Sequence, residues 1–175
     1  MTEALCDELS EKLEALGDLS WEIGPSDDDG LFIAISPDGN SDLLAVTRKI
    51  VSRAPHMKGW SPLPAKPPRE DMLRFTIEGD DGGEIAIDGS PWMYILYRLK
   101  DGKIEILIEQ NNLATASDEE RYLAAVILLD GLLGEERRLE LLDMIDTVPR
   151  LPPDLEQKSR SIQNLPDALK MVLHV

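Results

Sequence analysis

The spacing of apolar residues over the first third of the chain predicts two helices and two short strands. Leucines recur at helical spacing over residues 3–16. Apolar residues over 41–54 share one face in the same way, with Ser41 as the expected N-cap. Alternation at residues 21–23 and a compact apolar run at 31–35 predict strands between these helices.

The middle of the chain alternates between apolar and polar residues in the way that β-strands do. Residues 73–78 and 85–87 predict two strands, and residues 92–109 predict a hairpin. Asp101-Gly102 suits a two-residue type I′ turn, in which both central residues need positive φ. The pairs set by this turn are Leu99 with Ile104, Tyr97 with Ile106, and Ile95 with Ile108. We expect these six residues to share one face of the hairpin.

The other face of the predicted hairpin is also apolar, which leaves two interpretations open. The residues on this face are Trp92, Tyr94, Leu96 and Leu107. In one interpretation, a helix or the C-terminal segment covers them. In the other, they form an exposed apolar interface for a partner protein or for a second copy of the chain.

The last third of the chain predicts helices, with one ambiguous stretch. Residues 117–120 form a capping box, Ser-Asp-Glu-Glu, which opens a helix that ends near Leu133. The leucine spacing of residues 135–148 suits a second helix, but a strand over 142–148 remains open. A proline-rich linker follows, and a short helix is expected over 166–173.

This order of elements predicts an α+β fold with one central antiparallel β-meander sheet and helices packed mainly on one face. A chain of 175 residues fits one domain and can bury a sufficient core without a metal or a disulfide. We expect residues 1–148 to form that domain. Residues 149–175 would then be a linker and a short helix that packs on the same domain.

Charge is sorted along the chain. The formal net charge is -16, yet residues 43–69 contain six Lys or Arg and no Asp or Glu. Prolines predict extended chain over 55–69. The basic residues either pair with acids of the same chain or form a patch for a phosphate or an acidic protein surface. This candidate patch consists of Arg48, Lys49, Arg53, His56, Lys58 and Trp60.

Composition disfavours several classes of function. The acidic excess disfavours nucleic acid and anionic lipid as partners, because both present phosphates. The longest apolar run is too short to cross a bilayer, and the acidic N-terminus lacks the cationic start of a signal peptide, so we expect a cytoplasmic protein. No cluster of His or Cys and no nucleophile or phosphate-loop motif occurs. The sequence therefore predicts no catalytic residue, no metal site and no cofactor.

Two short motifs resemble uncharacterised bacterial proteins. Residues 54–60 read Ala-Pro-His-Met-Lys-Gly-Trp at the end of a predicted helix, and residues 132–135 read Leu-Leu-Gly-Glu. Both patterns are similar to small cytoplasmic families that are described only as domains of unknown function. The resemblance implies a bacterial α+β domain and a strand within 139–148. It implies no activity and no functional residue.

The sequence favours a non-enzymatic interaction or regulatory module. Its expected partner is a protein, engaged through a basic surface of that partner or through self-association. An immunity-like or inhibitor-like protein that masks a basic partner fits the acidic surface. Two alternatives remain open: a small hydrolase or transferase that uses His56 and carboxylates, and a domain that binds an anionic ligand through residues 48–69.

Overall fold

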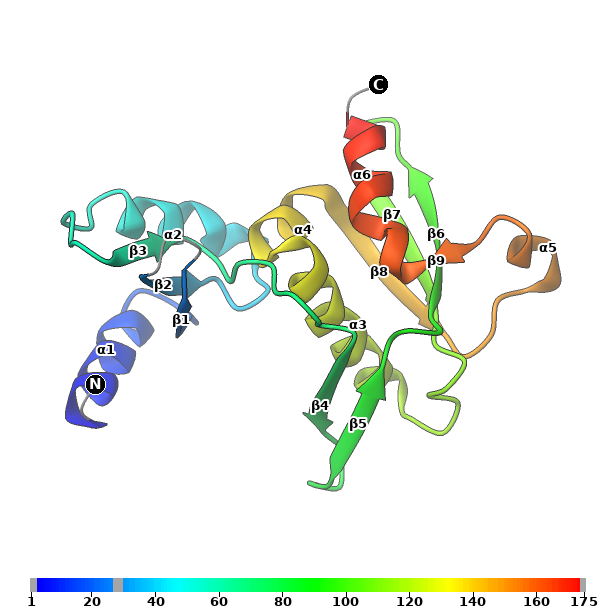
Figure 1. The fold of residues 1–175 in the computed structure, drawn as a ribbon, viewed down its shortest axis with the longest axis horizontal. Helices are drawn as coiled ribbons and strands as arrows, with labels where there is room; N and C mark the ends of the chain where they lie inside the picture. The colour runs from blue at the N-terminus through cyan, green and yellow to red at the C-terminus, as the bar shows by residue number, and fades with distance from the viewer. Residues whose placement is uncertain (1–2, 27–29, 174–175) are drawn as a thin grey trace. The chain divides into compact units, whose positions relative to one another are not determined.

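The structure confirms the α+β class and divides the chain into two compact units. The computed structural model describes residues 3–26 and 30–173. Unit 1 comprises Met1–Pro67 and Gly134–Glu140, and unit 2 comprises Pro68–Leu133 and Leu141–Val175. The chain therefore returns to unit 1 for one short helix before it completes unit 2 (Figure 1). Residues on both sides of position 148 belong to unit 2.

A three-stranded sheet forms the centre of unit 1. Its order is β1 (Ser20–Pro25), β2 (Leu31–Ser36) and β3 (Trp60–Leu63). β1 is antiparallel to β2, and β3 is parallel to it. The first two strands lie where alternation at residues 21–23 and the apolar run at 31–35 predicted them. β3 was not predicted because it contains Pro62, and it is an edge strand, where a residue without a backbone N–H is tolerated.

The described part of unit 1 also contains four helices. They are α1 (Glu3–Glu14), the 3₁₀ helix η1 (Ser41–Leu43), α2 (Leu44–Val51) and α4 (Glu135–Leu141). Of these, α1, η1 and α2 contribute side chains to the core of the unit, and α4 is hydrogen-bonded to the end of β2. The expected cap at Ser41 is wrong by one residue, because the side chain of Asn40 accepts a hydrogen bond from the Asp42 N–H at 3.0 Å. The core of this unit is small, with Leu13, Leu19 and Ile35 at its centre.

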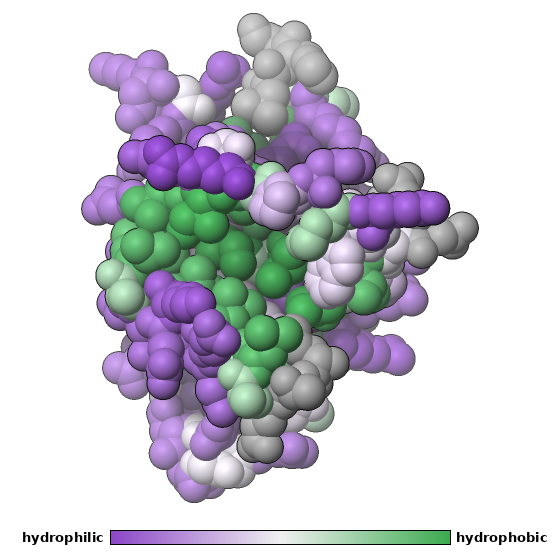
Figure 2. Space-filling view, turned by 90° about the vertical axis from the view of Figure 1, so that its left-hand side faces the viewer, coloured by the Kyte–Doolittle hydropathy of each residue, from purple (hydrophilic) through white to green (hydrophobic). Residues whose placement is uncertain are grey.

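One face of the unit 1 sheet is apolar along its whole length but only partly covered. The register places Trp21 beside Ile35 and Leu31 beside Trp60. Residues of α1 and α2 pack at the Ile35 end, whereas Leu31 is 41% exposed. Figure 2 looks onto the side where Figure 1 draws α1 and β1–β3, and it shows hydrophobic side chains gathered there among hydrophilic ones. Unit 1 therefore exposes apolar surface beyond its small core.

Unit 2 contains two sheets instead of the single meander expected from the sequence. A two-stranded sheet pairs β4 (Arg74–Glu78) with β5 (Glu84–Asp88). A four-stranded sheet has the order β8 (Leu142–Val148), β7 (Ile104–Glu109), β6 (Met93–Arg98) and β9 (Arg160–Ser161). β8 is parallel to β7, which a meander would not contain. The strand interpretation of residues 142–148 is confirmed.

Two helices cover one face of the four-stranded sheet. They are α3 (Asp118–Leu133) and α6 (Leu165–Leu173), and both contribute fully buried residues to the main core. The remaining elements of unit 2 are α5 (Pro153–Glu156) and the 3₁₀ helix η2 (Ile162–Asn164). α6 begins one residue before the helix that the sequence predicted. None of the helices in the described ranges is long and apolar enough to span a bilayer.

The register of the β6–β7 hairpin differs by one residue from the predicted one. Leu96 faces Ile106, Tyr97 faces Glu105, and the Leu99 N–H donates to the Lys103 carbonyl at 2.8 Å. Residues 100–102 therefore form a three-residue loop, with Gly102 at φ +91°. Three-residue hairpin loops place a residue with positive φ at this position, and glycine adopts it without steric cost.

This shift corrects the prediction of an apolar interface. Because side chains alternate across a strand, a one-residue slip moves Trp92, Tyr94 and Leu96 onto the face that carries the isoleucines of β7. Trp92 is 0% and Tyr94 1% exposed, and Leu96 packs against the same core. Leu107 lies on the opposite face and is half-buried. Helices of unit 2, one of them C-terminal, cover these aromatic residues, which are not available to a partner.

Candidate functional site

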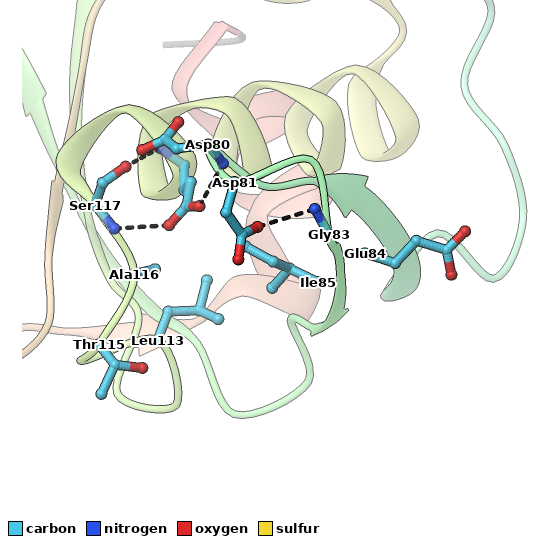
Figure 3. Close-up of a pocket in the computed structure, with 10 residues that line it drawn as sticks. Asp80, Asp81, Gly83, Glu84, Ile85, Leu113, Thr115, Ala116 and Ser117 are labelled. Carbon is cyan, nitrogen blue, oxygen red and sulfur yellow. Dashed lines mark hydrogen bonds between the residues drawn. The ribbon is translucent and has the colours of Figure 1, made fainter.

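An open pocket in unit 2 lies between the tip of the β4–β5 hairpin and the start of α3 (Figure 3). Its volume is about 620 Å³. The hairpin contributes Asp80, Asp81, Gly83, Glu84 and Ile85, and the segment that enters α3 contributes Leu113, Thr115, Ala116, Ser117 and Glu120. We refer to this site as the acidic pocket, because four of these residues carry carboxylates and none of them is Lys, Arg or His.

Glu120 holds the two walls of the acidic pocket together. One carboxylate oxygen accepts from the Asp80 N–H at 3.0 Å, and the other accepts from the Ser117 N–H at 2.8 Å. The Glu120 N–H in turn donates to Ser117 Oγ at 3.1 Å, so the predicted capping box is confirmed. The hydrogen bonds from Asp80 and Ser117 lower the pKa of Glu120 below its ordinary value of 4.5. This carboxylate is therefore ionised at neutral pH.

The hairpin tip approaches Glu120 closely because position 79 is a glycine. A Cβ at Gly79 would lie 2.9 Å from a side-chain carbon of Ile85 and 3.0 Å from Glu120 Oε1. The tip itself is closed by a hydrogen bond from the Gly79 N–H to the Gly83 carbonyl at 2.7 Å. Asp81 Oδ1 accepts from the Gly83 N–H at 2.9 Å. These contacts fix the tip and one aspartate without using a cation.

The carboxylates of the acidic pocket differ from many other acids of the chain because no basic side chain neutralises them. Elsewhere, ion pairs join Asp38 to Lys66 and Asp143 to Lys103. Within the described ranges, Asp80, Asp81, Glu84 and Glu120 take part in no such pair. Nor do any three His, Cys, Asp or Glu side chains there lie close enough to hold a metal ion. The pocket thus presents negative charge suited to the ammonium or guanidinium groups of a partner.

The basic segment is partly neutralised by acids of its own unit. Arg48 Nε donates to Glu136 Oε1 at 2.7 Å, and the same guanidinium also bonds Glu140. These hydrogen bonds, that of Glu140 foremost, raise the pKa of Arg48. Lys66 Nζ lies 3.3 Å from Asp38 Oδ1. Pairing within the chain, one of the two interpretations left open, is therefore observed for these two residues.

The members of the candidate basic patch differ in their surroundings. Arg48 faces α4, whereas Trp60 is a half-buried member of β3 beside Leu31. The side chains of Lys49, Arg53, His56 and Lys58 are exposed. No pairing of His56 with a carboxylate occurs among the residues that the structure describes, and His174, the second histidine, lies outside them.

Sequence reasoning missed the acidic pocket. The sequence predicted strands on either side of residues 80–83 and a helix cap at residues 117–120. These predictions are confirmed, but they did not show that the two segments meet through a hydrogen bond between positions that are 40 residues apart. The only signal in the sequence was that both segments, the β4–β5 connection and the start of α3, are rich in acidic residues. A count of acidic residues does not indicate which of them lie close together in space.

Comparisons with known proteins add no assignment. No family model matches the chain, and neither the curated proteins nor the solved structures that were searched contain a match.

Proposed function

We propose that this protein is a non-enzymatic interaction module that binds a basic segment of a partner protein through the acidic pocket of unit 2. The observation that carries the proposal is the convergence of Asp80, Asp81 and Glu120 on an open pocket whose lining includes no cation, whereas the Glu84 side chain points away from them (Figure 3). Complementary charge speeds encounter and favours the correct partner. A module that masks a basic protein, as an immunity or inhibitor protein does, uses this kind of surface.

The pocket supplies both charge and shape. Its volume admits one or two long basic side chains, and Ile85 and Leu113 give their aliphatic parts an apolar wall. Glu120 and Asp81 are held by backbone N–H groups and need little reorganisation when a cation binds. The net charge of -16 extends the attraction beyond the pocket.

A polylysine–arginine peptide with a fluorescent label tests this proposal. Fluorescence anisotropy should show binding that weakens as salt is raised, because exposed charges are screened. A variant with Asp80→Asn and Asp81→Asn should bind about tenfold more weakly. Glu120 is left unchanged because it caps α3.

A matched control separates the pocket from the general acidity of the protein. Glu70→Gln and Asp146→Asn remove the same number of charges from exposed positions of unit 2 that do not line the pocket. This control should retain most of the affinity. Equal weakening of both variants would show that the bulk field attracts the peptide, and the absence of any binding would reject a basic partner.

A further inference from the structure

A second pocket of unit 2 lies at the free edge of the four-stranded sheet, and none of its lining residues belongs to the acidic pocket. Its volume is about 400 Å³. Residues 94–97 of β6 line it together with Lys158, Arg160 and Ala168. Because the four residues of β6 are consecutive, the pocket follows the strand itself instead of one face of the sheet.

The edge of β6 beside this pocket is only half covered. β9 pairs with the first two residues of β6 and with none of the later ones (Figure 1). The Ile162 N–H donates to the Trp92 carbonyl at 3.0 Å, so the backbone of Trp92 points to this edge. The backbone groups of successive strand residues point to opposite edges of the strand. The N–H and C=O groups of Leu96 and Arg98 therefore point to the same edge as those of Trp92. No strand in the described part of the chain pairs with them, and an unpaired edge is a template for another strand.

Three cations surround this free edge. Lys158 and Arg160 line the pocket, and Arg98 ends β6. All three are exposed, and none forms an ion pair with any acid that the structure describes. In a protein with a net charge of -16, three such cations along one strand edge form a local site for negative charge.

Tyr94 supplies a buried polar group at the same place. The residue is 1% exposed, and its hydroxyl oxygen has no hydrogen-bond partner among the described residues. Burial raises the pKa of this hydroxyl, and the nearby Arg160 guanidinium opposes the effect only in part. The hydroxyl is therefore a protonated donor without an acceptor. A buried donor of this kind is destabilising until an acceptor is supplied.

We propose that an acidic segment of a partner protein binds here as an additional strand on β6, in line with β9. Its backbone pairs with Leu96 and Arg98, and one of its carboxylates lies between Arg160, Lys158 and the Tyr94 hydroxyl. The unpaired strand edge favours an extended peptide over a compact ligand, and the three cations favour an acidic one. This inference concerns a separate site and does not depend on the proposed role of the acidic pocket.

The test uses the full chain and short capped, fluorescent peptides that alternate glutamate with valine, isoleucine, leucine or tyrosine. At least one of them should bind in fluorescence anisotropy, and its counterpart with lysine in place of glutamate should not. N-methylation of alternate backbone amides of the bound peptide, on the edge that faces β6, should abolish binding because it blocks strand pairing. The same modification on the other edge should leave binding intact.

Two protein variants separate binding from folding. Lys158→Ala with Arg160→Ala should weaken binding about tenfold, whereas Lys170→Ala, which removes an exposed lysine paired with Asp167 outside the pocket, should not. Tyr94→Phe should weaken binding without lowering the melting temperature, because the hydroxyl that it removes has no partner.

Three results would overturn the proposal. The first is the failure of every acidic peptide to bind. The second is equal binding of peptides N-methylated on either edge, which would indicate a site for charge alone. The third is full competition by acetate or inorganic phosphate at equal concentration, which would indicate a small-anion site in place of a strand site.

Discussion

The Ser36 hydroxyl donates a hydrogen bond of 2.7 Å to the carboxylate of Glu135, 99 positions later in the chain. The same carboxylate accepts from the backbone N–H groups of Gly39 at 2.9 Å and of Lys66 at 3.1 Å. The backbone N–H of Glu135 donates a hydrogen bond to the Lys66 carbonyl. Glu135 is 1% exposed, and its bond with Ser36 is buried, whereas those from Gly39 and Lys66 are partly buried. One buried side chain therefore ties α4 to the end of β2 and to the chain that leaves β3.

Replacing Glu135 with alanine should destabilise unit 1 by about 3 kcal/mol. The substitution leaves the buried Ser36 hydroxyl and two partly buried backbone donors without their acceptor, and an unsatisfied buried group costs more than its bond contributed. Hydrogen exchange of residues 31–36, followed by mass spectrometry, should become faster. The matched control is Glu136→Ala, since Glu136 is exposed and its ion pair with Arg48 contributes about 1 kcal/mol or less. Unchanged exchange in Glu135→Ala would show that α4 is held by other contacts.

The stability of unit 2 should depend on pH through Glu120. Hydrogen bonds from Asp80 and Ser117 depress the pKa of this carboxyl in the folded state below the ordinary value of 4.5. At pH values between the folded and the unfolded pKa of Glu120, the unfolded chain therefore binds more protons than the folded one. The free energy of unfolding rises with pH over this interval. The contribution of ionised Glu120 to the free energy of unfolding is fully present above the ordinary pKa of about 4.5. It is lost as the pH falls through the pKa of the folded state.

Urea unfolding of Glu120→Gln at several pH values measures this contribution. The variant should be less stable than the parent at pH 7, and the difference should shrink toward pH 3. Glu119→Gln, at the exposed neighbouring position, serves as the control and should remain close to the parent at each pH. A difference that stays constant with pH would assign the loss to packing instead of ionisation.

Local sequence signals predicted most elements of this fold. The capping box joins Ser117 to a residue three positions later, so a short stretch of sequence predicts it. The alternation of apolar and polar residues that predicts β4 and β5 is likewise visible within each strand. The open question over residues 142–148 was a choice between two local patterns. There the strand is decided by pairing with β7, a contact that leucine spacing does not describe.

Partner choice between distant segments could not be predicted. β3 pairs with β2 although Pro62 disfavours an internal strand, and the parallel partner lies across the α2 helix. Arg48 stood out as a member of a basic segment, yet its partners Glu136 and Glu140 lie 88 and 92 positions later in the chain. The acidic pocket and the free edge of β6 likewise arise from convergence. Sequence patterns identify the residues but not their neighbours in space.

The register of the β6–β7 hairpin can be tested by cross-linking. In the observed register Tyr97 faces Glu105, whereas a two-residue turn at Asp101-Gly102 would place Tyr97 opposite Ile106. Directly opposed residues in an antiparallel pair have Cα atoms about 4.5–5.5 Å apart, a distance that a disulfide spans. The choice matters because the register decides whether Tyr94 belongs to the core and can contribute its hydroxyl to the edge pocket.

The cross-linking experiment starts from Cys6→Ser, which removes the only native cysteine. Tyr97→Cys with Glu105→Cys should form an intrachain disulfide on mild oxidation, detected by intact mass and by the loss of free thiol. Tyr97→Cys with Ile106→Cys should remain reduced, because these side chains point to opposite faces of the sheet. If the second pair cross-linked and the first did not, Trp92 and Tyr94 would lie on the outer face, and the edge pocket would lose its buried hydroxyl.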